Sequence, residues 1–204
     1  MDSEQAERDT EGTAPDHRFE GPAGHPVGGV KGDLGNNQAV LDRAQQIAPD
    51  QKVATIVSEG YESPNSLVPG AAEEHYARGA EKDLADFQQG LRVTHDGPPS
   101  HNTVLGHSYG STVVGYASRD HGLHADDIAF LGSPGVGVEH AGDLGVPADH
   151  VWAGTSRDDA IHLAASPDPT TWGGSPDQHW YGMNPADPAF GGNQIPSNPR
   201  RHET

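Results

Sequence analysis

Residues 103–117 combine a short apolar run, a Gly-x-Ser-x-Gly turn at Gly106, Ser108 and Gly110, and a stretch of small residues. This order predicts a strand, a sharp turn and a helix, the local form in which a serine nucleophile is presented. A side chain at Gly106 or Gly110 would collide with the strand or helix that the turn brings together. Because such a turn pushes the serine hydroxyl clear of the sheet, Ser108 is the candidate nucleophile.

The two neighbours of Ser108 in the turn have predicted roles of their own. The backbone N–H of Tyr109 follows the nucleophile at a helix N-terminus, where it would stabilise negative charge on the oxygen of a reacting carbonyl. His107 occupies the variable position of the motif and is expected to line the pocket rather than to take part in the chemistry. The motif thus predicts one oxyanion donor and one pocket residue.

Helical and strand-like segments alternate along the middle of the chain. Apolar runs of strand length occur at 53–57, 128–131 and 150–154, besides the run before the turn. Two segments have apolar residues at helical spacing, one from Asn36 or Asn37 onward, with 27–35 as a loop before it, and one over 72–93. Their predicted apolar faces are Val40, Leu41, Ala44, Ile47 and Ala48 in the first and Tyr76, Ala80, Leu84, Phe87 and Leu91 in the second. The alternation predicts a three-layer α/β domain with a mainly parallel sheet and a site at the carboxyl ends of its strands.

Branched apolar residues and phenylalanines mark out where a core can form. Of all Leu, Ile, Val and Phe residues, one precedes residue 27 and two follow residue 163. A segment without such residues cannot offset the entropy of its ordering. We therefore predict a flexible acidic tail at 1–26, one domain at 27–192, and a C-terminal tail at 193–204.

The chain is strongly acidic, with 30 Asp and Glu against 12 Lys and Arg and a formal charge of −18. Such a polyanion is not drawn to nucleic acid or to an anionic membrane, so no nucleic-acid partner is predicted. The absence of cysteine excludes disulfides and thiolate catalysis. No apolar run of membrane-spanning length and no secretory leader is seen in the sequence, so the default expectation is a cytoplasmic protein with no membrane span.

The residue pattern does not favour metal or cofactor chemistry. No His-Glu-x-x-His motif occurs, and the nearest paired ligands, His121 with His124 and His140 with Asp143, lie in polar stretches. No glycine-rich phosphate loop separates a strand from a helix. The sequence therefore predicts no metal and no cofactor, and metal-dependent hydrolysis is the least favoured alternative.

Four blocks of the sequence resemble one known family. They lie at 103–111, at 123–138, at 150–154 with Asp158 and Asp159, and, more weakly, at 184–192. Together they are similar to the actinobacterial α/β-hydrolases formerly catalogued as DUF1023, proteins of serine-hydrolase type with no assigned substrate. The most particular feature is a Gly-Ser-Pro-Gly sequence directly after a strand. The resemblance implies that the domain at 27–192 is an α/β-hydrolase.

The resemblance also implies the rest of the catalytic set, which in such enzymes follows the chain order serine, acid, histidine. Asp159 matches the acid block of the family, with Asp158 as the alternate, although both could instead be acids at a helix N-terminus. His202 is the base that position favours, and His179 is the alternate. Ser133, in the Gly-Ser-Pro-Gly block, is expected to line the pocket.

These inferences predict a serine hydrolase that cleaves an ester or related acyl bond of a small molecule through a Ser-Asp-His triad and an acyl-enzyme. The opening strand and the closing Gly-His segment of the family have no clear counterpart here, so the domain is expected to be shortened at one or both ends. A second hypothesis follows from this: a catalytically incomplete α/β-hydrolase scaffold that acts as a binding or interaction protein.

Overall fold

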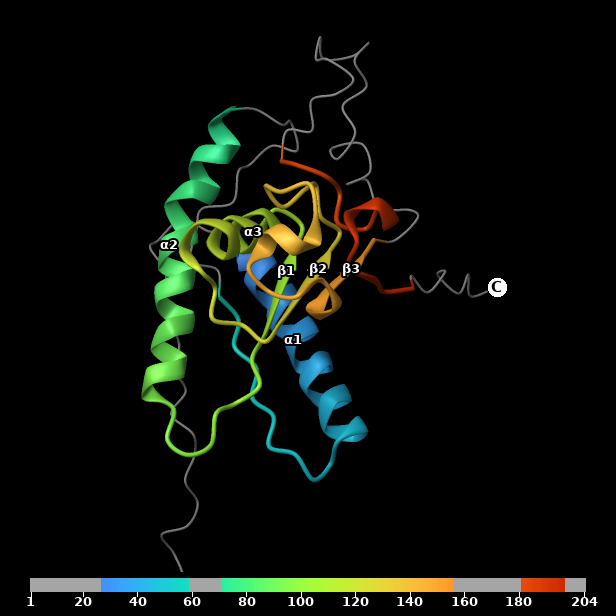
Figure 1. Ribbon diagram of the computed structural model, residues 1–204. Coiled ribbons are helices and arrows are strands. Elements are labelled where there is room, and N and C mark those ends of the chain that lie inside the picture. The colour runs from blue at the N-terminus through green and yellow to red at the C-terminus, as the bar shows by residue number, and fades with distance from the viewer. Residues whose placement is uncertain (1–26, 59–70, 156–180, 197–204) are drawn as a thin grey trace, which may run out of the picture. The chain divides into compact units, whose positions relative to one another are not determined.

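The computed structural model describes residues 27–58, 71–155 and 181–196 of the chain (Figure 1). By its internal contacts the chain divides into two compact units, Met1–Glu59 and Gly60–Thr204. The predicted tail at 1–26 lies outside the described residues. Within the described ranges, no helix is both long enough and apolar enough to cross a membrane.

The described part of the first unit contains one helix, α1 (Val27–Ile47). The prediction of a loop at 27–35 is wrong, since α1 already includes this glycine-rich stretch. A glycine inside a helix costs only about 1 kcal/mol and does not by itself end the helix. Of the predicted apolar face, Val40 and Ile47 are 52% and 69% exposed. The partly buried face of α1 therefore includes fewer residues than the sequence predicted.

The predicted buried strand at 53–57 does not form. These residues follow α1 without regular secondary structure, and Ile56 is 58% exposed. Exposure alternates along the segment, with half-buried side chains at Val53, Thr55 and Val57. An apolar run becomes a strand only where a neighbouring strand takes up its backbone hydrogen bonds. Among residues 27–58 no strand is present to do so.

The described part of the second unit is built on a parallel sheet of four strands (Figure 1). The strands pair in chain order and are β1 (Thr103–His107), β2 (Asp127–Leu131), β3 (Val151–Gly154) and β4 (Asn193–Gln194). A helix, α3 (Gly110–His121), connects β1 to β2. All three ladders are parallel. The predicted α/β class and the strands predicted before the turn, at 128–131 and at 150–154 are confirmed.

The shortest strand, β4, lies in a segment that the sequence assigned to the C-terminal tail. Asn193 pairs with Trp152 of β3, and Gln194 pairs with Ala153. A strand of two polar residues has no apolar pattern that a sequence could reveal, so its existence depends on pairing alone. The sheet therefore continues past the predicted boundary at residue 192.

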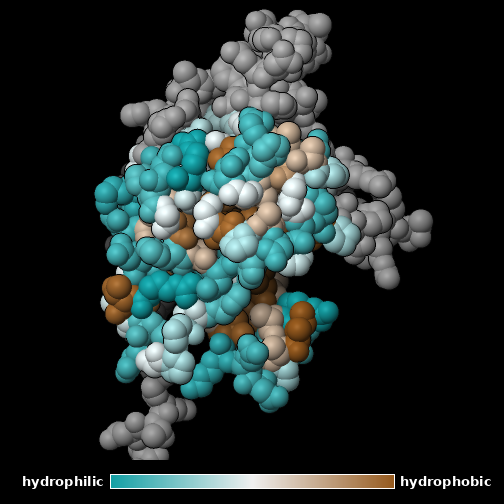
Figure 2. Space-filling model, in the orientation of Figure 1, coloured by the Kyte–Doolittle hydropathy of each residue, from teal (hydrophilic) through white to brown (hydrophobic). Residues whose placement is uncertain are grey.

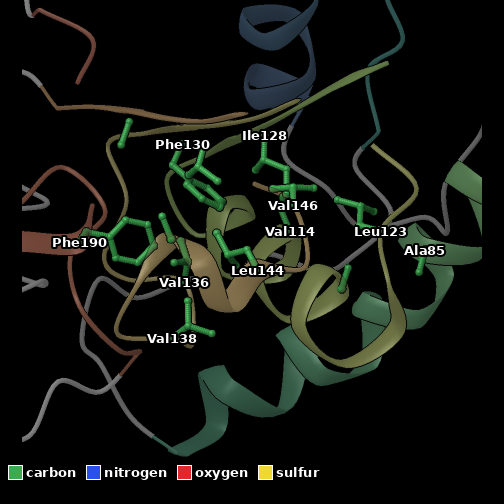
Figure 3. Close-up of a cluster of buried hydrophobic side chains, with 14 residues drawn as sticks. Ala85, Val114, Leu123, Ile128, Phe130, Val136, Val138, Leu144, Val146 and Phe190 are labelled. Carbon is green, nitrogen blue, oxygen red and sulfur yellow. The ribbon is translucent and has the colours of Figure 1, made fainter. Parts of the chain in front are cut away.

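The hydrophobic core lies on one face of this sheet (Figure 3). Side chains alternate between the two faces along a strand, and Ile128 and Phe130 of β2 point to the core face and are fully buried. They belong to one cluster with Val114 of α3 and with Leu144 and Phe190 from the segments that follow β2 and β3. The core thus joins the sheet to α3 and to the loops around the carboxyl ends of the strands.

The opposite face of the sheet is less covered. Leu105 of β1 and Trp152 of β3 are 49% and 41% exposed there. Figure 2 shows that the face of the molecule in view carries mainly hydrophilic side chains, with hydrophobic ones in small separate areas. The weakly apolar composition is thus visible as a mainly hydrophilic surface on the face in view.

The helix α2 (Ala71–Thr94) confirms the helix predicted over 72–93 and packs against α3. Ala80, Ala85 and Gln88 of α2 are 8%, 5% and 5% exposed. The prediction that Phe87 belongs to the buried face is wrong, because its side chain is 44% exposed. With 3.6 residues per turn, Phe87 lies at the edge of a face that is centred near Gln88.

Hydrogen bonds at the amino ends of the strands tie α2 to the sheet. The Arg92 guanidinium donates to the backbone oxygens of His124 at 2.9 Å and Ser100 at 2.5 Å. It also donates to the Asp126 carboxylate at 2.5 Å. Burial by itself would raise the pKa of Asp126, but the hydrogen bonds from Arg92 and from the Asn102 backbone N–H outweigh burial and hold that pKa below its ordinary value.

Asp127, the first residue of β2, is bound by three side chains. Its carboxylate lies 2.5 Å from His101 Nε2 and 3.1 Å from His150 Nδ1, and Trp152 Nε1 donates to it at 3.3 Å. Burial acts to raise the pKa of Asp127, but the hydrogen bonds from His101, Trp152 and His150 together lower it below the ordinary value of 3.8. The charged carboxylate therefore stabilises the fold.

Acid is expected to remove this contribution. A carboxylate whose pKa is lowered on folding adds stability above its unfolded pKa, near 3.8, and the contribution is lost as the pH falls through the lower folded pKa. We expect Asp127→Asn to lower the free energy of unfolding by about 1 kcal/mol at neutral pH and to match wild type in strong acid, where both side chains are uncharged. Urea unfolding from neutral pH to strong acid measures the loss of stability and its disappearance in acid. Asp143→Asn, at an exposed position, is the control. An equal loss at every pH would contradict the role given to the charge.

Candidate active site

The predicted turn joins β1 to α3 around Ser108 (Figure 1). Ser108 has φ +52°, and in the described part of the chain it is the one non-glycine residue with a positive φ. For a residue with a side chain this left-handed conformation costs about 1–2 kcal/mol. Strained backbone of this kind persists only where the surrounding structure holds it, and it concentrates at functional sites. The sharp strand-to-helix turn predicted at Ser108 is therefore present, and its backbone is strained at this residue.

Backbone hydrogen bonds hold Ser108 on both sides. Its N–H donates to the carbonyl oxygen of Leu131 at 2.9 Å, and its own carbonyl oxygen accepts the N–H of Ser111 at 3.0 Å. A Cβ at Gly106 would lie 2.6 Å from Ser111 Cα, a distance that real Cβ atoms do not show. The steric role predicted for Gly106 is therefore confirmed.

The ends of three strands are level at this edge of the sheet. The N–H of Ser108 continues the ladder from β1 to Leu131, and the N–H of Gly132 continues it from β2 to the oxygen of Gly154 at 3.0 Å. Because all the strands are parallel, the residues that follow β1, β2 and β3 emerge at the same edge. This edge contains the turn with Ser108, the Gly-Ser-Pro-Gly segment at 132–135 and Thr155.

Two side chains beside Ser108 differ in their surroundings. His107 is exposed and Tyr109 is half-buried. The ring of Tyr109 meets the ring of the buried Tyr181 edge to face, with centroids 6.1 Å apart. Tyr109 is also the N-cap residue of α3, with φ −60° and ψ −28°. Its backbone N–H therefore lies at the positive end of the helix dipole, which favours a developing oxyanion.

Ser133, expected at the pocket wall, is 1% exposed and lies behind the turn. Its Oγ lies 2.6 Å from Ser111 Oγ and accepts the backbone N–H of Gly135 at 3.1 Å. Ser111 Oγ in turn lies 2.5 Å from the carbonyl oxygen of Ser108. Ser111 is not among the residues predicted from the sequence, although a hydroxyl residue in the first turn of a buried helix was the available signal.

A second hydroxyl ties α3 to the same segment. Thr112 Oγ1, which is fully buried, donates to the carbonyl oxygen of Gly135 at 2.9 Å. The Oγ1 of Thr155, just after β3, is buried and has no hydrogen-bond partner within the described ranges. Buried polar groups are normally hydrogen-bonded, which makes the Thr155 hydroxyl an exception at this edge of the sheet.

The remaining predicted site residues, Asp158, Asp159, His179 and His202, lie outside the described residues. The structure therefore brings together Ser108, Tyr109 and Ser133 of the predicted set and describes His107 as exposed beside them. In the described ranges, no group of three or more His, Asp or Glu side chains is arranged so that it could hold a metal ion. The described arrangement is a serine in a strained turn at a helix N-terminus, which suits attack on an acyl carbon.

Comparison with known proteins gives a family but no activity. A family model described as Alpha/beta hydrolase matches residues 29–168. An uncharacterised protein of Mycobacterium tuberculosis is 36% identical over 126 residues, which are 61% of this chain and 19% of that protein. An uncharacterised protein of Mycobacterium bovis is 37% identical over 100 residues, which are 49% of this chain and 37% of that protein. The chain thus spans well under half the length of these curated relatives. No solved structure matches.

Proposed function

The chain belongs to an α/β-hydrolase family, and on that premise we propose that it is a serine hydrolase in which Ser108 attacks an ester or related acyl bond of a small molecule. The observation that carries this proposal is the left-handed backbone of Ser108, at φ +52°. A glycine would adopt this conformation without strain. A serine in this conformation is strained, and such strain is typical of a residue whose hydroxyl is presented beyond the edge of the sheet for catalysis.

The proposed reaction has two steps through an acyl-enzyme. Ser108 Oγ forms a bond to the carbonyl carbon of the substrate while its proton passes to a histidine base. The carbonyl oxygen becomes an oxyanion next to the backbone N–H of Tyr109 at the start of α3. The bond to the leaving alkoxide then breaks as the alkoxide takes the proton. Water attacks the acyl-enzyme in the same way and releases the acid and the free serine.

For the other two triad members we propose Asp159 as the acid and His202 as the base. The support for Asp159 is its match to the acid block of the family and its place a few residues after β3, whose carboxyl end lies at the edge occupied by Ser108. The support for His202 is its position after that acid in the chain. Asp158 and His179 are the alternates. The carboxylate would hold the imidazole in the tautomer that accepts the serine proton.

Labelling with a fluorophosphonate probe tests the proposal. We expect the full-length wild-type chain to take up label at one site and Ser108→Ala to take up none, because only an activated serine reacts with this probe. Ser58→Ala, which removes an exposed serine far from Ser108 in the sequence, should label as wild type does. Label retained in Ser108→Ala would overturn the assignment. Folded wild type that takes no label would support the catalytically incomplete scaffold instead.

The same assay assigns the acid and the base. Asp159→Asn should slow labelling and Asp158→Asn should not, since only one carboxylate can orient the histidine. His202→Ala should likewise slow it, with His179→Ala as the matched control. A reversed order within either pair would transfer the role to the alternate residue.

A further inference from the structure

Two buried serines behind the turn have no role in the reaction proposed above. We infer that Ser133 and Ser111 are positioning residues, which act through the backbone of Ser108 and hold its hydroxyl where it reacts. The inference rests on the proposed function for its catalytic consequence. It stands on the hydrogen bonds of the described residues for its geometry.

Four groups form one continuous hydrogen-bonded series, called here the hydroxyl chain. It runs from the N–H of Gly135 to Ser133 Oγ, from there to Ser111 Oγ, and from there to the carbonyl oxygen of Ser108. The three distances are 3.1 Å, 2.6 Å and 2.5 Å. Ser111 and Ser133 are 0% and 1% exposed, so protein atoms surround both hydroxyls.

The chemistry of the groups fixes the direction of the hydroxyl chain. A carbonyl oxygen can only accept, so the single proton of the Ser111 hydroxyl goes to Ser108. The Gly135 N–H can only donate, so it occupies one lone pair of Ser133 Oγ. The Ser133 hydroxyl proton is then free to bond Ser111 Oγ, which completes the series. Every donor in it has one acceptor, and no proton is left over.

The hydroxyl chain acts on the strained residue itself. The carbonyl oxygen of Ser108 accepts both the backbone N–H and the hydroxyl of Ser111, so both of its lone pairs are used. Its N–H is bound to Leu131. These three bonds fix both peptide groups that flank the φ +52° backbone. Because a strained conformation persists only where its surroundings impose it, loss of one bond lets the turn relax and moves the hydroxyl.

Ser133 joins this turn to the next strand. It lies after β2, whereas Ser111 lies after β1, and the two strands pair in parallel. A second hydrogen bond, from Thr112 Oγ1 to the carbonyl oxygen of Gly135, connects α3 to the same segment. Ser133 therefore transmits the position of the segment at 132–135 to Ser108, although its own side chain is buried and does not reach the surface.

Labelling kinetics with the full-length chain test the positioning role. Ser133→Ala and Ser111→Ala should each lower the maximal rate constant of fluorophosphonate labelling by about tenfold, because small displacements of a nucleophile slow attack strongly. The probe concentration that gives half the maximal rate should stay unchanged, since the surface that binds the probe is intact. A positioning role predicts this separation, whereas partial unfolding would instead lower the amount of labelled protein.

Ser118→Ala is the matched control. Ser118 belongs to the same helix, is 3% exposed, and donates its hydroxyl to the carbonyl oxygen of Leu144, away from the turn. It should lose stability as the other two variants do and label at the wild-type rate. Equal slowing in Ser118→Ala, or a wild-type rate in Ser133→Ala, would overturn the inference.

A double-mutant cycle separates this inference from the proposed function. Both single substitutions break the same Oγ–Oγ bond, so the urea midpoint of the Ser111→Ala, Ser133→Ala double variant should fall by less than the sum of the two single shifts. If wild type takes no label, the proposed function fails on its own account and the cycle alone decides: coupled shifts support the hydroxyl chain, and additive shifts overturn it.

Discussion

Gly115→Ala is expected to destabilise the second unit strongly. Gly115 lies inside α3, and a Cβ there would stand 2.1 Å from the carbonyl oxygen of Val136 and 2.7 Å from its Cβ. Val136 is fully buried in the core, so neither partner can move without displacing others. Overpacking of this kind costs about 3 kcal/mol, which outweighs the roughly 1 kcal/mol by which alanine is the better helix former.

A second helical glycine provides the control for this prediction. Gly79 lies in α2, and a Cβ there would meet no atom within 4 Å. Gly79→Ala should therefore raise the free energy of unfolding by up to about 1 kcal/mol, while Gly115→Ala should lower it. Urea unfolding of the two variants measures the opposite signs. A stable Gly115→Ala protein would show that the contact between α3 and the segment after β2 is looser than described.

Ser108→Gly is expected to raise stability while it abolishes turnover. Glycine adopts φ +52° without the steric penalty that serine and alanine share there. The free energy of unfolding of Ser108→Gly, measured with urea, should thus exceed that of Ser108→Ala by about 1 kcal/mol. Both variants lack the hydroxyl proposed as the nucleophile, so hydrolysis of a small activated ester should fall by a factor on the order of 10⁴ or more in each.

The order of the two variants at Ser108 can be checked against Ser118, which has the regular backbone of α3. There, alanine should be more stable than glycine, because glycine is the poorer helix former. The contrast isolates backbone strain from the loss of a hydroxyl. If Ser108→Gly were the less stable variant at Ser108 too, strain would not explain the turn. Ester hydrolysis that survives both substitutions would remove Ser108 from the mechanism.

The features that the sequence predicted well depend on residues close together in the chain. The turn around Ser108, the strand at 128–131 and the helix over 72–93 each follow from local spacing and sterics. The predicted membership of an α/β-hydrolase family is confirmed by the match at 29–168. The assignment of Asp159 and His202 stays a prediction, because both lie outside the described residues.

Apart from the loop predicted at 27–35, where α1 forms instead, the wrong predictions concern features that depend on distant partners. The apolar run at 53–57 has the composition of a strand but forms none. Phe87 has the spacing of a core residue but lies at the edge of the buried face of α2, because the partner helix decides which face is covered. The polar pair Asn193–Gln194 forms β4, because β3 offers it hydrogen bonds.

By itself, the sequence determined the order of strand, turn and helix around Ser108 and the need for glycine at Gly106. Both follow from short-range sterics, which neighbouring residues impose in any context. Only the tertiary structure decided that the side chain of Ser133 is bound to that of Ser111. Their hydroxyls are 22 positions apart in the chain, and they meet because β1 and β2 pair in parallel and release their following residues at one edge of the sheet.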